Sequence, residues 1–292
     1  MANLNFDEIL NPKSEENHNY GDIFKGSILN LKEKPERPPI AISIGYDKKE
    51  YNGYRYPLKF GSFGNISVIG GEEKSRKTWF KSLLLGCALS KHPEDYSSTI
   101  KGHDLDDKFI IDIDTEQSPY DNWVTSNRIP RMIGSEENLI YPENYISLNL
   151  REQTPKIIQG TLEWLFMESE YRNKLGIVSI DGFVDCVNDF NNNVESLDFT
   201  RKLMRYTSIS KCHLTGVMHL NPASIKIRGH LGTVLGQKAE MVAIVKDMGE
   251  FSQVSCKSVR GSKKFEDFGI SVNNNWLPYE FNEDVNKNWI DD

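Results

Sequence analysis

The sequence has 292 residues, of which 38% are hydrophobic, and a formal net charge of -7. This length and apolar content suffice for one large folded domain with appendages. The acidic balance argues against a generally basic nucleic-acid coat, so contact with nucleic acid has to come from a local patch or from a pore lined by several copies. The four cysteines are scattered, which argues against a disulfide framework or a Cys-x-x-Cys metal clip and favours a reducing cytoplasm.

Both ends of the chain are predicted to be appendages. Residues 1–36 are rich in Asn, Glu and Lys and carry only scattered apolar residues. We interpret them as an arm whose short apolar clusters dock on a neighbouring subunit or, alternatively, as a disordered tail. Residues 280–292 are predicted to be a frayed acidic tail. The sequence begins without a signal peptide and has no run of eighteen apolar residues, so we expect no membrane contact and a cytoplasmic location.

Residues 37–279 are predicted to form one α/β domain. Two strands of a hairpin-like lead-in, at 40–44 and 54–58, precede an apolar strand from 65 and a helix from 77 to about 89. Strands follow at 108–114, 145–150, 175–181 and 213–219, and helices at about 119–131, 155–171 and 194–210. This alternation predicts a doubly wound, mainly parallel sheet. Beyond residue 229, short strands at 241–245, 252–259 and 268–272 predict an antiparallel extension of one sheet edge.

The turn between the strand from residue 65 and the helix from Lys77 carries the first candidate site. From Gly71 the spacing is that of G-x-x-x-x-G-K-[ST], with Arg76 at the second glycine and with Lys77 and Thr78 in register. Backbone N–H groups and the helix N-terminus of such a loop hold phosphates, and the Thr78 hydroxyl ligates Mg²⁺. The alternative is a strand-to-helix turn with an N-cap. The predicted nucleotide-binding residues are Gly71, Lys74, Ser75, Arg76, Lys77, Thr78 and Trp79.

Two later strands end in acidic residues. Ligands of open α/β sheets bind at the carboxyl ends of the strands, so we expect these acids near the loop. Asp181 has the position and type of the Walker B carboxylate that holds Mg²⁺ through water, and the alternative is an ordinary N-cap. Glu116 is predicted to deprotonate the attacking water. The alternative there is that Asp112, Asp114 and Glu116 cap the next helix.

A histidine and several cations complete the set. His219 ends its strand as a candidate sensor of the γ-phosphate, although a lone histidine at a strand end is more often a structural residue. Residues 226–238 combine three glycines with three cations and are interpreted as a mobile loop, in which Arg228 is a candidate arginine finger for an adjacent subunit. Lys257 and Arg260 are further candidates for that role. All of these cations are alternatively solvated surface charges.

The order of these motifs resembles the RecA-like ATPases of the RepA and KaiC type, which include hexameric replicative helicases and relatives of plasmids, phages and mobile elements. The resemblance covers about residues 55–272. It implies that Lys77 and Thr78 bind phosphate and Mg²⁺, that Glu116 is the general base and that Asp181 is the Walker B acid. It further implies that His219 is the sensor and Arg228 the finger, with Lys257 and Arg260 at a position that some relatives use in trans. Arg76 departs from the pattern, because close backbone approach normally requires glycine there.

The resemblance implies an ATP- and Mg²⁺-dependent ATPase that forms a homo-oligomeric, hexameric ring and acts on single-stranded DNA as a helicase or replication motor. A second hypothesis is a nucleotide-switched assembly or regulatory ATPase with slow hydrolysis. The acidic charge keeps this second hypothesis open. A small-molecule kinase is disfavoured because the sequence offers neither a basic lid nor an acceptor pocket.

Overall fold

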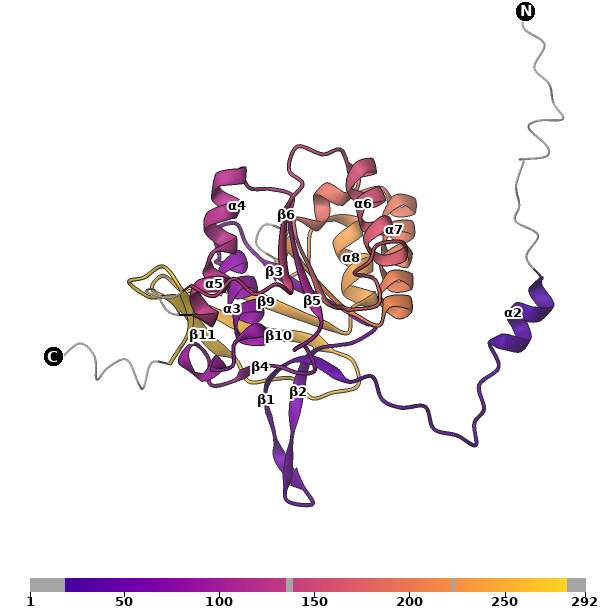
Figure 1. The fold of residues 1–292 in the computed structure, drawn as a ribbon, viewed down its shortest axis with the longest axis horizontal. Helices are drawn as coiled ribbons and strands as arrows, with labels where there is room; N and C mark the ends of the chain where they lie inside the picture. Colours follow the sequence, from indigo (N-terminus) through magenta and orange to yellow (C-terminus); the bar gives the residue numbers. More distant parts are fainter. Residues whose placement is uncertain (1–18, 135–138, 222–223, 283–292) are drawn as a thin grey trace, which may run out of the picture. The chain divides into compact units, whose positions relative to one another are not determined.

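The computed structural model of the chain describes residues 19–134, 139–221 and 224–282 (Figure 1). The chain divides into two compact units, Met1–Arg37 and Pro38–Asp292. In the first unit, helix α2 (Tyr20–Gly26) begins after Asn19, whose side chain accepts hydrogen bonds from the N–H groups of Gly21 and Asp22. No residue of α2 is buried. The predicted apolar cluster before residue 19 lies outside the described part of the chain.

The second unit is built on a nine-stranded sheet with the order β12-β11-β10-β9-β3-β8-β7-β5-β6. All strands from β9 to β6 in this order pair in parallel, and β10, β11 and β12 add an antiparallel edge. The α/β class with a mainly parallel sheet is therefore confirmed. The parallel strands are β3 (Ile66–Gly71), β5 (Phe109–Asp114), β6 (Tyr145–Asn149), β7 (Leu175–Asp181), β8 (His213–His219) and β9 (Met241–Asp247).

Helices cover both faces of this sheet, and each face has its own hydrophobic core. Adjacent residues of a strand point to opposite faces, and accordingly Ile69 belongs to one core and Val68 to the other. The first core takes in α3 (Lys77–Leu89) and α5 (Arg128–Ile133), and the second takes in α6 (Pro155–Met167), α7 (Asn193–Ser210) and α8 (Gly229–Lys238). Figure 1 shows these two groups of helices on opposite sides of the parallel strands. Burial on both faces explains why these strands are continuously apolar.

A second, three-stranded sheet has the order β2-β1-β4. Its strands are β1 (Ile40–Tyr51), β2 (Tyr54–Ser62) and β4 (Ile100–Gly102). Strands β1 and β2 are longer than predicted and form an antiparallel hairpin. Asn52 and Gly53 connect them with φ angles of 53° and 80°, the combination that two-residue hairpin turns require.

The structure corrects the interpretation of residues 226–238 as a mobile loop. Residues 229–238 form α8, which buries Leu231, Val234 and Leu235 at helical spacing. Because α8 provides the crossover from β8, strand β9 pairs in parallel with β3 and does not belong to the antiparallel extension in which it was predicted. The glycines and cations of this segment concealed the short apolar stripe.

Several boundaries also differ from the prediction. The helix expected at 119–131 is divided into α4 (Pro119–Ser126) and α5, and α6 ends at Met167. The predicted tail from residue 280 begins too early, because β12 (Pro278–Phe281) pairs with β11 (Phe268–Val272), which itself pairs with β10 (Ser252–Val259). Glu280 is held in place by hydrogen bonds from Ser97 and Thr99. Residues 283–292 lie outside the described part. Two short 3-10 helices, Pro93–Asp95 and Phe183–Cys186, complete the second unit.

Candidate functional site

The carboxyl ends of four parallel strands surround one cavity of about 460 Å³. Strands β3, β8, β7 and β5 are consecutive neighbours in the sheet, so residues that follow them meet at the same edge. Most of the predicted site residues share this cavity, although they come from segments far apart in the sequence. The lining consists of Lys74, Ser75, Arg76, Lys77, Thr78, Trp79, Glu116, Asp181, Val184, Val217, Met218 and His219.

The turn from β3 to α3, residues 72–76, contains two residues with left-handed backbone conformation. Lys74 and Arg76 have φ angles of 60° and 66°, and Ser75 between them does not share this left-handed conformation. Alternating handedness of this kind creates concave arrays of backbone N–H groups that suit anions. The Ser75 hydroxyl donates to the carbonyl of Glu72 across the turn at 2.8 Å. The turn is therefore closed by its own side chain.

Gly71 does not line the cavity but makes the turn possible. A Cβ atom at this position would lie 2.5 Å from the Ser75 hydroxyl oxygen and 2.6 Å from the carbonyl oxygen of Val245. Only glycine fits this close approach. Gly71 was predicted to bind nucleotide, but the structure places it outside the cavity lining, where it supports the turn by allowing close approach of Ser75 and of Val245 on the neighbouring strand β9.

The unexpected Arg76 sits in a left-handed conformation at the N-cap of α3. This conformation explains why the sequence pattern has glycine here, since a side chain adds strain of about 1–2 kcal/mol. The guanidinium group donates to the carboxylate of Asp247 at 2.9 Å, to the Ser252 hydroxyl at 3.0 Å and to the carbonyl of Gly249 at 2.8 Å. These hydrogen bonds to the β9–β10 region offset the strain. They also occupy guanidinium N–H groups that could otherwise donate to a phosphate.

Lys77 begins α3 and points its ammonium group into the cavity region. The Nζ atom donates to the carbonyl of Glu72 and lies 3.3 Å from Nδ1 of His219. Burial lowers the pKa of Lys77, and the charges of Asp181 and Glu116 act in the opposite direction. A largely buried cation beside two acids is well placed to hold an anionic ligand.

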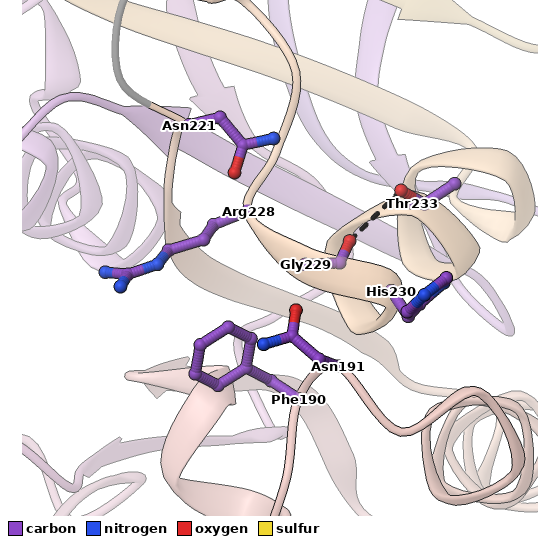
Figure 2. Close-up of a pocket in the computed structure, with 7 residues that line it drawn as sticks. All are labelled: Phe190, Asn191, Asn221, Arg228, Gly229, His230 and Thr233. Atoms are coloured by element: carbon purple, nitrogen blue, oxygen red, sulfur yellow. Dashed lines mark hydrogen bonds between the residues drawn. The ribbon is translucent and has the colours of Figure 1, made fainter.

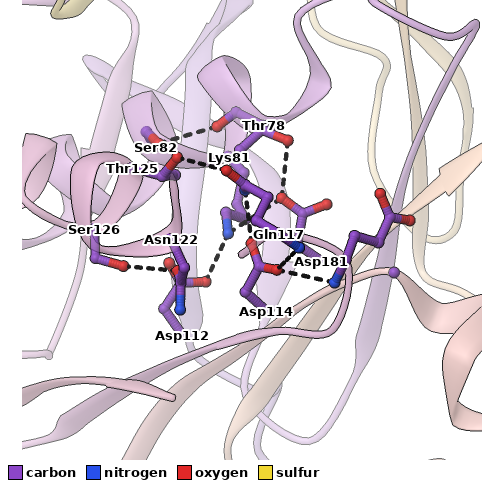
Figure 3. Close-up of polar contacts among 12 residues, drawn as sticks. Thr78, Lys81, Ser82, Asp112, Asp114, Gln117, Asn122, Thr125, Ser126 and Asp181 are labelled. Atoms are coloured by element: carbon purple, nitrogen blue, oxygen red, sulfur yellow. Dashed lines mark hydrogen bonds and ion pairs between the residues drawn. The ribbon is translucent and has the colours of Figure 1, made fainter. Parts of the chain in front are cut away.

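Thr78 and Asp181 lie in direct contact at the floor of the cavity. The Thr78 hydroxyl donates to Oδ2 of Asp181 at 2.9 Å. Asp181 is also 3.3 Å from the ammonium group of Lys81, which lies 3.0 Å from Asp112. Figure 3 shows these side chains converging from α3, β5 and β7. Oxygen atoms from a hydroxyl and a carboxylate thus stand side by side at the point where Mg²⁺ was predicted.

Lys81 is the most deeply buried cation of this network, with 1% of its side chain exposed. Burial alone would lower its pKa, but the charges of Asp112 and Asp181 outweigh burial and raise the pKa above its usual value. The Tyr145 hydroxyl donates to the other oxygen of Asp112 at 3.2 Å. Lys81 therefore stays charged and forms ion pairs with the carboxylates of Asp112 and Asp181.

Glu116 extends into the cavity after β5. Burial, followed by the charges of Asp181 and Asp185, raises the pKa of Glu116 to about 7. Its Oε1 atom lies 3.9 Å from Nε2 of His219. Gly182 has a φ of 103°, and a Cβ atom there would lie 2.9 Å from Cγ of Glu116, so this glycine permits the two turns to approach each other.

None of the three acids Asp112, Asp114 and Glu116 caps the next helix, but Asp114 shapes the turn that precedes it. Its carboxylate accepts hydrogen bonds from the N–H groups of Glu116 and Gln117 and from the Gln117 side chain, so it shapes the turn after β5. The N-cap of α4 is Ser118. Asp112 pairs with Lys81, and neither Asp112 nor Glu116 caps the helix.

His219 stands between Lys77 and Glu116 at the end of β8. Burial lowers its pKa, and the nearby charges of Lys77 and Arg228 add to this effect. A neutral imidazole can accept a hydrogen bond at one ring nitrogen and donate a hydrogen bond from the other. The two ring nitrogens of His219 thus face Lys77 and Glu116, and the 3.9 Å to Glu116 is longer than a hydrogen bond.

Trp79 forms the aromatic side of the cavity. The guanidinium carbon of Arg128 lies 3.3 Å from the centre of the Trp79 ring, and Trp276 stacks on Trp79 with ring centres 6.5 Å apart. Burial lowers the pKa of Arg128 to about 10. Arg128 and Trp276 thus pack against the Trp79 ring.

Arg228, Lys257 and Arg260 do not line this cavity. Arg228 precedes α8 and belongs to a second pocket of about 350 Å³, where its guanidinium group faces the ring of Phe190 at 5.3 Å (Figure 2). The side chains of Lys257 and Arg260 donate to the carbonyls of Ile225 and Gln237. Their predicted action concerns a neighbouring subunit and stays a prediction.

Two cations of the site were not found from the sequence. Lys81 follows Lys77 by four residues and precedes the buried Leu84 and Leu85 by three and four, so helical spacing could have indicated a lysine directed toward the core. Arg128 carries no comparable signal, because its contact with Trp79 depends on how α5 packs against α3.

Metal-ligand clusters, membrane-spanning helices and disulfides were also sought among the described residues. No cluster of three or more His, Cys, Asp and Glu side chains within residues 19–134, 139–221 and 224–282 could hold a metal ion by itself. In the same ranges, no helix combines the length and apolar character that a membrane crossing requires. The four cysteines are buried and unpaired by disulfides.

A comparison with known protein families finds no match, and a comparison with curated protein sequences finds none either. Function therefore has to be inferred from the residues around the cavity.

Proposed function

We propose that the protein is a RecA-like P-loop ATPase. The observation that carries this proposal is the convergence of Lys77, Thr78, Asp181, Glu116 and His219 on one cavity from four neighbouring parallel strands. A phosphate-binding turn, an acid next to the Thr hydroxyl and a second acid with an elevated pKa are the parts that nucleoside triphosphate hydrolysis requires.

The residues of the turn and of α3 hold the substrate. The ammonium group of Lys77 pairs with the terminal phosphates of ATP, and Trp79 lines the same cavity. Thr78 and Asp181 fit Mg²⁺, which prefers hard oxygen ligands and keeps several waters, so two protein side chains suffice. When bound there, Mg²⁺ neutralises developing negative charge on the phosphates.

Glu116 acts as the general base. A pKa of about 7 lets this carboxylate accept a proton from the attacking water near neutral pH while binding that proton firmly enough to be useful. His219 contacts both Lys77 and Glu116, so it responds to the presence of a terminal phosphate and transmits that change toward Arg228, whose N–H group donates to the His219 carbonyl at 2.9 Å.

The test of the ATPase proposal is the variant Glu116→Gln. We expect phosphate release to fall by at least about 100-fold while the affinity for ATP changes little, because only the proton acceptor is lost. Glu152→Gln, which alters an exposed acid outside the cavity, is the matched control. Unchanged turnover in Glu116→Gln would remove this glutamate from the mechanism.

We further propose that the ATPase forms a homo-oligomeric ring, a hexamer by the family resemblance, and acts as a motor on single-stranded DNA. The positions of Arg228, Lys257 and Arg260 outside the cavity of their own chain support a role at the site of a neighbour. Mixing the inactive variants Glu116→Gln and Arg228→Ala tests this role. Recovery of activity in the mixture is expected, since some interfaces then combine two intact residues, and no recovery would contradict action in trans.

A nucleotide-switched assembly protein with slow hydrolysis is the second candidate. The strained Arg76 and its bonds to Asp247, Ser252 and Gly249 favour this candidate, because they occupy the position at which glycine normally permits close approach to the phosphates. Stimulation of phosphate release by single-stranded DNA supports the motor, and an unstimulated rate together with ATP-dependent assembly supports the switch.

A further inference from the structure

The hairpin of β1 and β2 extends away from the rest of the second unit, as Figure 1 shows. Its outer half, residues 48–56, is exposed along its whole length. None of these residues lines the cavity of the proposed ATPase. The inner half of the hairpin is part of the first core through residues such as Ile42 and Phe60, but the outer half contributes nothing to it and is free to bind a ligand.

One face of the outer hairpin is aromatic. Tyr51 pairs with Tyr54 across the two strands, and Tyr56 follows Tyr54 by two residues, so the three side chains share a face. Their exposed fractions are 40%, 74% and 59%, and the rings of Tyr51 and Tyr56 lie 5.7 Å apart. Exposing three large rings to water is unfavourable unless a ligand covers them.

Cations lie on both faces of the hairpin. The ammonium group of Lys49 lies 5.1 Å from the centre of the Tyr51 ring on the aromatic face. That of Lys101 on β4 lies 5.9 Å from the ring of Tyr46, which pairs with Pro57 on the other face. The acidic groups nearby are engaged in ion pairs of the hairpin and its surroundings. These pairs are Asp47 with Lys263, Glu266 with Lys48 and Glu50 with Arg55.

The hairpin therefore differs in charge from the whole chain. Between residues 46 and 56 the hairpin carries three cations (Lys48, Lys49 and Arg55) and two carboxylates (Asp47 and Glu50), which leaves an excess of one positive charge. The chain as a whole carries -7. A locally positive, tyrosine-rich surface on an acidic protein is complementary to an anionic ligand with planar groups.

We propose that the β1–β2 hairpin binds single-stranded nucleic acid. Unpaired bases stack on the exposed rings of Tyr51, Tyr54 and Tyr56, and the backbone phosphates follow the lysines beside them. A duplex hides the faces of its bases, so it lacks the stacking contribution. This inference names the surface for the strand in the proposed motor and rests on that part of the proposed function, whereas binding itself requires neither ATP nor hydrolysis.

The test uses the full chain, a fluorescently labelled dT20 strand and its duplex with dA20, measured by anisotropy at fixed salt. We expect Tyr54→Ala/Tyr56→Ala to weaken dT20 binding at least about tenfold, since stacking on each ring accounts for about fivefold or more. Tyr120→Ala/Tyr141→Ala, which removes two exposed tyrosines elsewhere, is the matched control and should bind normally. Equal affinity for dT20 in both double variants, or equal affinity of the unaltered protein for dT20 and duplex, would overturn the proposal.

Cross-linking of the unaltered protein provides a second readout that does not depend on any variant. A dT20 strand containing 5-iododeoxyuridine should label Tyr51, Tyr54 or Tyr56 on irradiation, and labelling confined to residues outside the hairpin would contradict the proposal. Basal phosphate release separates this result from failure of the ATPase. If Tyr54→Ala/Tyr56→Ala retains basal turnover and dT20 affinity but changes its oligomeric state, the hairpin is a subunit contact and the proposal is wrong.

Discussion

Replacing Lys81 by Met removes the only cation that the structure places within 4 Å of both Asp112 and Asp181, among the described residues. The methionine side chain has a similar length, so little volume is lost. The two carboxylates, each with 4% of the side chain exposed, remain in the core without their counter-charge. Removing one partner of a buried ionic network costs about 3–5 kcal/mol, which is a large part of the stability of about 5–15 kcal/mol of a typical domain.

The pH dependence identifies the cause of this loss. Without Lys81, two carboxylates are buried with no counter-charge, and burial disfavours their charged form. The penalty is therefore complete near neutral pH and decreases in acid, where protonation removes the buried charges. We expect urea unfolding to show a larger difference between Lys81→Met and the unaltered protein at pH 8 than at pH 5.

Two further variants control this experiment. Lys81→Met/Asp112→Asn should recover about 1–2 kcal/mol of the loss, because one unpaired charge is removed while an oxygen remains for the Tyr145 hydroxyl. Lys91→Met alters an exposed lysine beyond α3 and should change the stability by less than about 0.5 kcal/mol. A loss below about 1 kcal/mol for Lys81→Met, or a loss independent of pH, would refute the role assigned to Lys81.

Three other changes test the local geometry of the site. Arg76→Ala and Arg76→Gly both lose the hydrogen bonds of the guanidinium group, but only glycine relieves the strain of the left-handed backbone. Arg76→Gly should therefore be more stable to urea than Arg76→Ala by about 1 kcal/mol. Equal stability of the two variants would argue against strain. Gly71→Ala places a Cβ atom 2.6 Å from the Val245 carbonyl and should destabilise the fold by about 1–3 kcal/mol, so an unchanged melting temperature would contradict the close approach. Glu116→Gln should stabilise the protein at pH 8 and not at pH 4.5, because the charged carboxylate is disfavoured above its folded pKa of about 7; since 41% of the side chain is exposed, the gain is discounted to about 1 kcal/mol, and a gain of equal size at pH 4.5 would refute this cause.

The parallel part of the fold was predictable because burial on both faces leaves an unambiguous pattern. Strands β7 and β8 match their predicted bounds, since continuous apolar runs end there in Asp181 and His219. Helix α8 was missed because glycines and cations outnumber the apolar side chains that it buries, and the pairing of β9 was then misassigned. Strand β12 was missed because the Ser and Thr partners of Glu280 are nearly two hundred residues away.

The candidate site was predictable to the extent that each residue follows a recognisable strand. Thr78, Glu116, Asp181 and His219 needed only the rule that the carboxyl ends of neighbouring parallel strands meet. Contacts made across the core carry no such local signal. The stack of Arg128 on Trp79 is of this kind, as its partners come from α5 and α3.

Equilibrium binding of a fluorescent ATP analogue in the presence of Mg²⁺ tests the central claim most directly. If the triphosphate lies in the cavity of Lys77 and Thr78, the unaltered protein binds the analogue and Lys77→Met weakens binding about 10- to 100-fold through loss of a charge-assisted hydrogen bond. The control Lys91→Met should bind like the unaltered protein. Equal affinity in Lys77→Met and the unaltered protein would contradict the account.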